Sequence, residues 1–238
     1  MRRTIVTGGT RGIGRAVAHA LAADGGQVMI TGRDQAGVNE AVAALAKDVD
    51  DSSRIAGIAS DIRDRASVEG LITETAKRFG GVDALVNNAG VGVFADVASM
   101  TDADWHQVID TNLTGVFYAS RAVLPELRKS GGGWIINVAS LAGRNYFPGG
   151  AAYCASKAGL VAFTEALMQE VRFDGIRVSV VMPGSVATEF SGSSPTDADA
   201  WKLTSEDVAL VVTDLLRHPG RSLPSKIEIR PAQPRPAR

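Results

Sequence analysis

The feature that most constrains the fold is a regular alternation of short β-branched runs with longer segments of helical periodicity. The short runs predict seven strands, over 4–7, 28–31, 54–58, 84–87, 134–138, 177–181 and 226–229. The longer segments predict helices over approximately 12–24, 34–48, 65–79, 103–129, 152–173 and 205–217. Because the strands are mostly unbroken apolar runs, they are typical of a parallel sheet that is covered on both faces. Right-handed crossovers then give a doubly wound α/β fold with a mostly parallel, seven-stranded sheet.

The chain length is consistent with one domain. Its 238 residues are 45% hydrophobic and 21% charged, which is enough to bury a full core. The last predicted helix opens with a capping box formed by Thr204 and Asp207. We therefore expect a single domain over 1–230, followed by a Pro-rich tail over 231–238.

Composition and charge narrow the classes of partner. The formal net charge is -1 and no basic run is present, which argues against a nucleic-acid partner and favours small molecules. A single cysteine, Cys154, and an N-terminus without a signal-peptide pattern predict a cytoplasmic location. No apolar run could span a bilayer, so we expect a soluble protein with no membrane partner. His19, His106 and His218 fall in no metal-ligand spacing, so we predict no metal.

A glycine-rich turn follows the first predicted strand and opens the first predicted helix. The segment runs Thr7-Gly-Gly-Thr-Arg-Gly-Ile-Gly14. Glycines there would let the backbone approach a pyrophosphate, whose charge the helix N-terminus would favour. The spacing differs from the usual G-x-G-x-x-G fingerprint, and such glycines also serve tight turns that bind nothing. By itself the turn leaves both interpretations open.

Three further stretches decide between them. Asn87-Asn-Ala-Gly90 ends the fourth strand, Ser140 follows the fifth, and Tyr153 precedes Lys157 by four residues. In this order and at these separations, with the glycine turn, they resemble the short-chain dehydrogenase/reductase family, which has a Rossmann fold. The resemblance extends from Thr4 to about Thr188 and includes Asp61, Asn112, Pro183 and Gly184.

Tyr153 and Lys157 lie one helical turn apart and therefore share a face. A nearby ammonium lowers the pKa of a phenol, so we expect Lys157 to tune Tyr153 as an acid/base. The resemblance implies that Tyr153 exchanges a proton with a carbonyl or alcohol oxygen to which Ser140 also donates. It also implies that Lys157 holds the nicotinamide ribose and that Asn112 anchors a water on a proton path.

The resemblance also implies a set of cofactor contacts. These are Gly8, Arg11, Gly12, Ile13 and Gly14 at the pyrophosphate and adenosine side, Asp61 and Ile62 at the adenine, Asn87, Ala89 and Gly90 at the ribose and the floor, Tyr153 and Lys157 at the nicotinamide ribose, and Pro183, Gly184, Val186 and Thr188 at the nicotinamide. Cys154 neighbours the tyrosine but projects to another face, so we interpret it as a packing residue.

The end of the second strand predicts NADP(H) as the cofactor. An NAD enzyme commonly places a carboxylate there, but this chain has Gly32 followed by Arg33. Arg33 and Arg11 could converge on a 2′-phosphate, which arginine binds through forked hydrogen bonds. The alternative is that Arg33 is a solvated surface residue and that Asp34 binds the ribose, although Asp34 is better placed to cap the next helix.

The substrate is less constrained. Pocket walls are expected from Val91, Val93, Phe94, Leu141, Ala142, Phe147, Met182 and Phe190. This mainly apolar set mildly favours a ketone, an aldehyde or a 3-oxoacyl group. A short polar lid, open or mobile, is expected over Ser185–Leu203, and the C-terminus lacks the glycine-rich ending of many relatives. The alternative function is a non-catalytic protein of the same fold that senses NADP(H).

The two longest predicted helices carry more apolar residues than one face requires. These are Val116, Phe117, Val123 and Leu124 on the first, and Leu160, Phe163 and Leu167 on the second. Such a surplus commonly marks a partner surface, and the resemblance implies a two-fold helix bundle. We therefore predict a homodimer or homotetramer.

Overall fold

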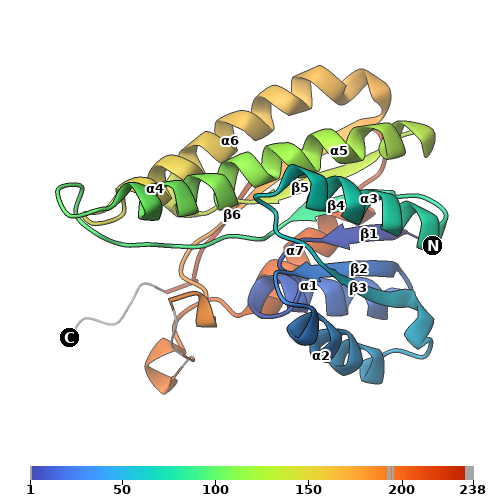
Figure 1. The fold of residues 1–238 in the computed structure, drawn as a ribbon, viewed down its shortest axis with the longest axis horizontal. Coiled ribbons are helices and arrows are strands. Elements are labelled where there is room, and N and C mark those ends of the chain that lie inside the picture. Colours follow the sequence, from blue (N-terminus) through green and yellow to red (C-terminus); the bar gives the residue numbers. More distant parts are fainter. Residues whose placement is uncertain (1, 192–193, 195, 234–238) are drawn as a thin grey trace.

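The structure, a computed structural model, describes residues 2–191, 194 and 196–233. Its centre is one seven-stranded parallel sheet with the strand order β3-β2-β1-β4-β5-β6-β7 (Figure 1). The strands are β1 (Arg3–Val6), β2 (Gln27–Gly32), β3 (Ile55–Ala59), β4 (Ala84–Asn87), β5 (Gly133–Val138), β6 (Ile176–Pro183) and β7 (Lys226–Ile229). The predicted doubly wound α/β fold is confirmed.

Helices cover both faces of the sheet. Figure 1 shows α3, α5 and α6 on one face and α1, α2 and α7 on the other. The helices are α1 (Gly12–Ala23), α2 (Gln35–Leu45), α3 (Arg65–Phe79), α4 (Asp102–Ile109), α5 (Gly115–Lys129), α6 (Ala151–Val171) and α7 (Ser205–Arg217). The capping box predicted for Thr204 and Asp207 is present at the start of α7.

The double cover explains why the strands are apolar at consecutive positions. Successive side chains of a strand point to opposite faces. Ile5 therefore packs with the α3 and α5 side of the core, while its neighbour Val6 packs with the α1 and α7 side. Both side chains are fully buried. A polar residue at either position would be buried without a partner, so the alternating pattern of a half-exposed strand does not occur.

The helix predicted over approximately 103–129 is confirmed, but it contains one irregular turn. Two α-helices, α4 and α5, are joined by a five-residue π-helical turn over Asp110–Thr114. The wider turn accompanies two buried polar side chains, Thr111 and Asn112, and Asn112 is completely enclosed. The periodicity of apolar residues could not show this turn because apolar positions continue on both sides of it.

The strand order places a crevice above the carboxyl ends of the strands. β1 pairs with β2 on one side and with β4 on the other, so the connections diverge at this point. In open α/β sheets, ligands bind outside the carboxyl ends at such a switch point.

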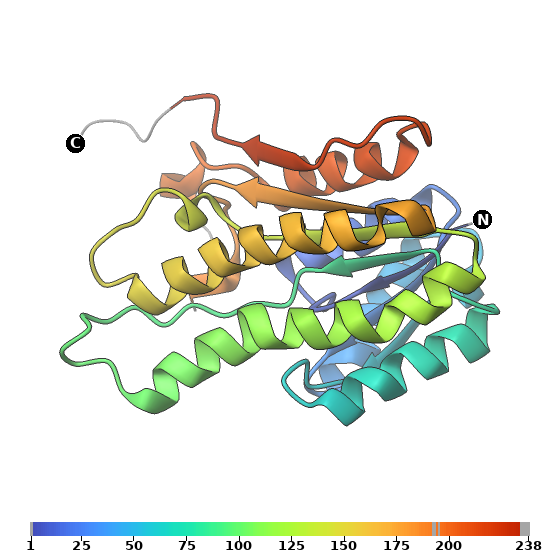
Figure 2. The same cartoon turned by 90° about the horizontal axis from the view of Figure 1, so that it is seen from above.

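Figure 2 shows the long, roughly parallel helices α5 and α6 over the sheet. Among the described residues, no helix is long and apolar enough to cross a membrane.

Candidate active site

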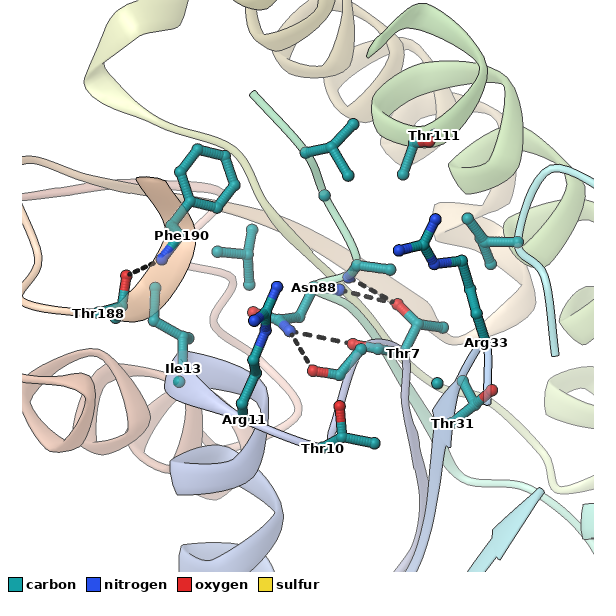
Figure 3. Close-up of a pocket in the computed structure, with 18 of the residues that line it drawn as sticks. Thr7, Thr10, Arg11, Ile13, Thr31, Arg33, Asn88, Thr111, Thr188 and Phe190 are labelled. Atoms are coloured by element: carbon teal, nitrogen blue, oxygen red, sulfur yellow. Dashed lines mark hydrogen bonds between the residues drawn. The ribbon is translucent and has the colours of Figure 1, made fainter. Parts of the chain in front are cut away.

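A cavity of about 560 Å³ lies at the switch point (Figure 3). Its lining combines most of the residues predicted for the cofactor with the proposed catalytic residues. The predicted members are Gly8, Arg11, Gly12, Ile13, Arg33, Asp61, Ile62, Ala89, Gly90, Ser140, Tyr153, Lys157, Pro183, Gly184, Val186 and Thr188. Gly14, also predicted, does not line the cavity itself. The volume lies within the range of small-molecule and cofactor sites.

The glycine turn has a geometry that only glycine adopts easily. Gly8 and Gly12 have φ angles of 63° and 52°, in the left-handed region. A Cβ at Gly14 would overlap the carbonyl oxygen of Gly8 and the side-chain amide of Asn88. Arg11 precedes α1 without a side-chain cap, so the first N–H groups of this helix lack that partner. This cradle fits the pyrophosphate of a dinucleotide.

Asn88 holds the glycine turn in place. Its amide nitrogen donates to the carbonyl oxygens of Thr7 and Gly8 at 3.0 and 3.1 Å, and its backbone N–H donates to Thr7 Oγ1 (Figure 3). Sequence reasoning missed both Asn88 and Thr7, which line the cavity. The pair of adjacent asparagines was the available signal, but it did not indicate which of the two faces the cavity.

Asn87, predicted at the ribose, does not line the cavity. It ends β4 and is 2% exposed, and its side chain points into the protein. There it donates to Asn137 Oδ1 of β5 at 2.8 Å, and Asn137 donates to Thr164 Oγ1 of α6 at 2.8 Å. We call Asn87, Asn137 and Thr164 the amide chain. The residue alternation of β4 explains the correction, because consecutive side chains cannot face the same side.

Arg33, Asp61 and Arg63 line the part of the cavity that was predicted to hold the adenosine. Asp61 accepts a hydrogen bond from Arg63 Nη2 at 2.6 Å, and this contact lowers the pKa of Asp61. The carboxylate expected near adenine is thus already paired. Sequence reasoning missed Arg63 because an arginine after a strand is ordinarily a solvated surface residue.

The residues at the end of β2 and just after it include one carboxylate, Asp34, that was considered as a partner for the ribose. Asp34 accepts hydrogen bonds from the backbone N–H groups of Ala36 and Gly37, so the predicted cap of α2 is confirmed. A Cβ at Gly32 would press on the methyl group of Thr10 at 2.8 Å. Arg33 is exposed, and in Figure 3 its guanidinium extends toward the cavity.

Arg11 also lines the cavity, and its ion-pair partner, Glu189, lies in the segment 185–203 that was predicted to form a lid. Its guanidinium lies 3.8 Å from the carboxylate of Glu189. The ends of this segment are tied together, since Ala187 N donates to Leu203 O and Leu203 N donates to Ser185 O. Residues 192, 193 and 195 of the predicted lid lie outside the described residues.

Ser140, Tyr153 and Lys157 meet at the inner end of the cavity. Ser140 Oγ accepts a hydrogen bond from Ala142 N at 3.1 Å, which leaves the hydroxyl hydrogen free to donate. Burial raises the pKa of the Tyr153 phenol, and the neighbouring Ser140 hydroxyl opposes this rise. The phenol is therefore protonated at neutral pH.

Lys157 is buried beneath the tyrosine. Its Nζ donates to Val138 O at 3.0 Å and lies 5.8 Å from the centre of the Tyr153 ring. Burial lowers the pKa of Lys157 to about 8. The expectation that Lys157 lowers the pKa of Tyr153 is therefore not met in this structure, because desolvation governs the pKa of both groups.

Asn112 lies behind this group rather than on the cavity wall. Its amide nitrogen donates to Val91 O and to Ser156 Oγ, and its oxygen accepts from Val91 N. Ser156 Oγ in turn donates to the carbonyl oxygen of Tyr153. Asn112 thereby fixes the segment after β4 against the start of α6.

The buried lysine makes stability depend on pH. The pKa of lysine in an unfolded chain is about 10.4. Between about pH 8 and this value, the unfolded chain binds more protons than the folded protein does, so folding stability rises with pH. Between pH 7 and about pH 9.5, we expect wild type to gain about 2 kcal/mol of unfolding free energy relative to Lys157→Met. Urea unfolding of both proteins at each pH measures the difference. If the unfolding free energies of the two proteins changed equally with pH, Lys157 would not have a lowered pKa in the folded protein.

Aromatic side chains surround the tyrosine. The ring centres of Phe94 and Phe190 lie 5.6 and 5.7 Å from that of Tyr153. Of the expected substrate walls, Val91 and Phe190 line the first cavity, and Leu141, Ala142 and Phe147 line a second cavity beside it. Met182 does not line either one, because it is 1% exposed and packs in the core. Val93 and Phe94 likewise line neither cavity, although Phe94 contacts the Tyr153 ring.

Cys154 and the histidines lie outside this chemistry. Cys154 is buried and free, as expected of a packing residue. His19 lies 3.6 Å from Asp48, and His218 contacts Ser222. The described residues contain no cluster of three or more His, Cys, Asp or Glu side chains that could hold a metal ion.

The fold and the site together place the protein in the class of nucleotide-binding oxidoreductases. This class is indicated by the doubly wound sheet, the glycine turn at its switch point and the Ser-Tyr-Lys group beside that turn. The comparison with known families specifies the class further. The model of the short chain dehydrogenase family matches residues 2–199, and the chain belongs to that family.

Relatives and solved structures agree with this assignment. The chain is 40% identical over 195 residues to the 3-oxoacyl-(acyl-carrier-protein) reductase FabG of Haemophilus influenzae, covering 79% of this chain and 75% of that protein. It is 35% identical to sulfoacetaldehyde reductase 2 of Chromohalobacter salexigens, covering 96% and 94%. An alcohol dehydrogenase from Thermococcus sibiricus, solved with 5-hydroxy-NADP, superimposes with a TM-score of 0.90 at 29% identity, with both chains covered completely.

Proposed function

We propose that this protein is an NADP(H)-dependent oxidoreductase that transfers hydride between the nicotinamide and a carbonyl or alcohol substrate. The observation that carries the proposal is the grouping of Ser140, Tyr153 and Lys157 at the inner end of the cavity at the sheet's switch point. Two of the relatives described above are named as reductases of carbonyl compounds, which supports a ketone, an aldehyde or a 3-oxoacyl group as substrate.

The side chains divide the work of carbonyl reduction. A bound nicotinamide supplies the hydride. Ser140 donates a hydrogen bond to the carbonyl oxygen, and the Tyr153 phenol transfers its proton to that oxygen as negative charge develops there. Lys157 holds the ribose beside the tyrosine, and Asn112 fixes the segments that carry the site. In the reverse direction, Tyr153 must first lose its proton, so a phenol with a raised pKa favours reduction at neutral pH.

The test of this function is the absorbance of NADPH during incubation with a panel of ketones, aldehydes and alcohols. Oxidation of NADPH by one or more carbonyl compounds supports the enzyme. A protein that binds NADPH but turns over nothing in the panel supports the alternative, a cofactor sensor of the same fold. The intact Ser140, Tyr153 and Lys157 group favours the enzyme.

The choice of NADP(H) is supported by Arg33, which faces the cavity, and by Asp34, which is occupied as a helix cap. A hydrogen bond to a charged group is worth about 1.5–3 kcal/mol, so Arg33→Ala should lower kcat/KM for NADPH by roughly tenfold to a hundredfold. The value for NADH should change little. Arg65→Ala is the control, because Arg65 pairs with Glu69 on α3 away from the cavity. A wild-type preference for NADH, or equal losses for both cofactors, would refute NADP(H).

We also propose a homodimer or homotetramer, with a smaller contact surface than the sequence suggested. Val116, Val123, Leu160 and Leu167 belong to the buried core and cannot form a surplus. Phe117 remains 40% exposed, forms an edge contact with Phe163 of α6, and carries the Arg121 guanidinium over its ring. Leu124 is half-buried beside them.

Light scattering at micromolar concentration should give at least a dimer mass for wild type and a monomer mass for Phe117→Glu, because a charge cannot be buried unpaired in an apolar contact. Phe173→Glu is the matched control, since Phe173 is 93% exposed in the turn after α6. A monomeric wild type would remove the proposal.

A single domain over 1–230 and a cytoplasmic location complete the proposed description.

A further inference from the structure

A second cavity lies beside the catalytic residues and adjoins the first. It measures about 550 Å³ and shares Ser140, Tyr153 and Gly184 with the first cavity. Its remaining walls include the polar side chains of Asn145 and Gln233. A carbonyl group bound at Ser140 and Tyr153 would therefore send one substituent toward the nicotinamide side and could send the other into this second cavity.

Arg230 is the one charged residue that the described part of the chain contributes to the walls of the second cavity. It follows β7 directly, and the pairing of Gly184 N with Ile229 O at 2.8 Å fixes this strand end against the residue shared by the two cavities. The guanidinium donates to Glu228 Oε2 at 2.9 Å, which orients it. Guanidinium has five N–H donors, so one hydrogen bond leaves most of its donors for a ligand.

The charge around Arg230 is positive. Glu228 is shared with Arg144, whose guanidinium lies 2.6 Å from Oε1. Hydrogen bonds from Arg230 and Arg144 lower the pKa of Glu228, so this carboxylate stays ionised. Two guanidiniums therefore surround one carboxylate, and the cluster carries a net charge of about +1. Of the two arginines, only Arg230 reaches the cavity wall in the described structure.

We propose that the second cavity binds an anionic substituent of the substrate, such as a carboxylate, and that Arg230 is the specificity-determining residue that recognises it. This inference rests on the proposed function, because it places the reacting carbonyl at Ser140 and Tyr153. Forked hydrogen bonds from guanidinium suit planar oxyanions, and a neutral isostere of the same shape gains much less from them.

The test uses a series of oxo acids that differ in chain length: 3-oxobutanoate, 4-oxopentanoate and 5-oxohexanoate, each beside its amide. Kinetics are measured with NADPH for wild type, Arg230→Gln and Arg144→Gln. For at least one chain length, wild type should favour the acid over its amide by roughly tenfold in kcat/KM, a moderate value because Arg230 is half exposed. In Arg230→Gln the ratio should fall close to one, because kcat/KM for the acid falls much more than kcat/KM for the amide.

Arg144→Gln separates direct recognition from a general field effect. Like Arg230→Gln, it removes one guanidinium that pairs with Glu228, but Arg144 does not line the second cavity. Arg144→Gln should keep most of the acid preference. Arg230→Lys, which retains a positive charge at position 230, should keep part of the preference that Arg230→Gln loses. Equal losses in Arg144→Gln and Arg230→Gln, or no acid preference in wild type at any chain length, would overturn the inference.

Binding without turnover distinguishes this inference from the proposed function. Trp201 lines the second cavity, so its fluorescence should report oxo acids that bind there. If acids quench the fluorescence saturably in wild type but not in Arg230→Gln, and no carbonyl is reduced, the anion site stands and the proposed function fails. If neutral ketones are reduced but acids are neither preferred nor bound through Arg230, the function stands and the anion site fails.

Discussion

Tyr153→Phe should lower the turnover of carbonyl reduction by about a hundredfold or more, which is the usual contribution of a general acid. The substitution removes the hydroxyl that donates the proton and keeps the aromatic ring. Packing against Phe94 and Phe190, at 5.6 and 5.7 Å, is retained, so stability and NADPH affinity should change little. Single-turnover absorbance of NADPH measures the chemical step directly.

The control for this variant is Tyr146→Phe. Tyr146 is 71% exposed and lines neither cavity, so its variant should keep the wild-type rate. The pH profile gives an independent check. Because burial raises the pKa of Tyr153, wild-type reduction should be flat around neutral pH, and alcohol oxidation should speed up as pH rises. Near wild-type turnover of Tyr153→Phe, with chemistry rate-limiting, would show that another group donates the proton.

Gly14→Ala should weaken NADPH binding by about a hundredfold, since the backbone of the glycine turn must move and a hydrogen bond to a charged group such as pyrophosphate is worth up to about 3 kcal/mol. The added methyl group would overlap the Gly8 carbonyl and the Asn88 amide, and neither can retreat without breaking the hydrogen bonds that hold the turn. The variant should also unfold at lower temperature, as overpacked sites usually cost about 1–3 kcal/mol. Fluorescence titration and thermal unfolding measure the two effects.

Gly70→Ala is the matched control. Gly70 lies on the exposed side of α3, and a Cβ there meets nothing within 4 Å. Replacing a helical glycine by alanine stabilises by about 1 kcal/mol, so this variant should melt slightly higher and bind NADPH normally. If Gly14→Ala binds NADPH as tightly as Gly70→Ala does, the cofactor does not use this turn.

Local patterns were sufficient to predict most of the sheet and the helix caps. Each buried strand is an apolar run whose length and neighbours are visible in the sequence, and Asp34 and Thr204 cap the helices that they precede. The π turn over Asp110–Thr114 was not predictable in the same way. Its signature is a backbone hydrogen-bond pattern, and the apolar periodicity on either side continues without interruption.

The candidate site was predicted less evenly. Residues that share a helical face, such as Tyr153 and Lys157, could be brought together by periodicity alone. The facing of Asn87 and Asn88 depends on how the strand enters the sheet, and the pKa of Lys157 depends on burial by distant segments. No role was predicted for Arg230, because its place beside Gly184 arises from the pairing of two strands that are far apart in sequence.

The amide chain has a consequence for the precision of the site. Apolar contacts are nearly indifferent to direction, so a helix resting on a sheet through aliphatic side chains alone could slide or roll slightly at little cost. The Asn137 to Thr164 bond is directional, and it locks the roll of α6 against β5 at one point along its length. Tyr153 and Lys157 belong to the same helix, so this bond, about three turns from Tyr153 and two from Lys157, supports their orientation from outside the cavity, in addition to the bond from Lys157 to Val138 O within it.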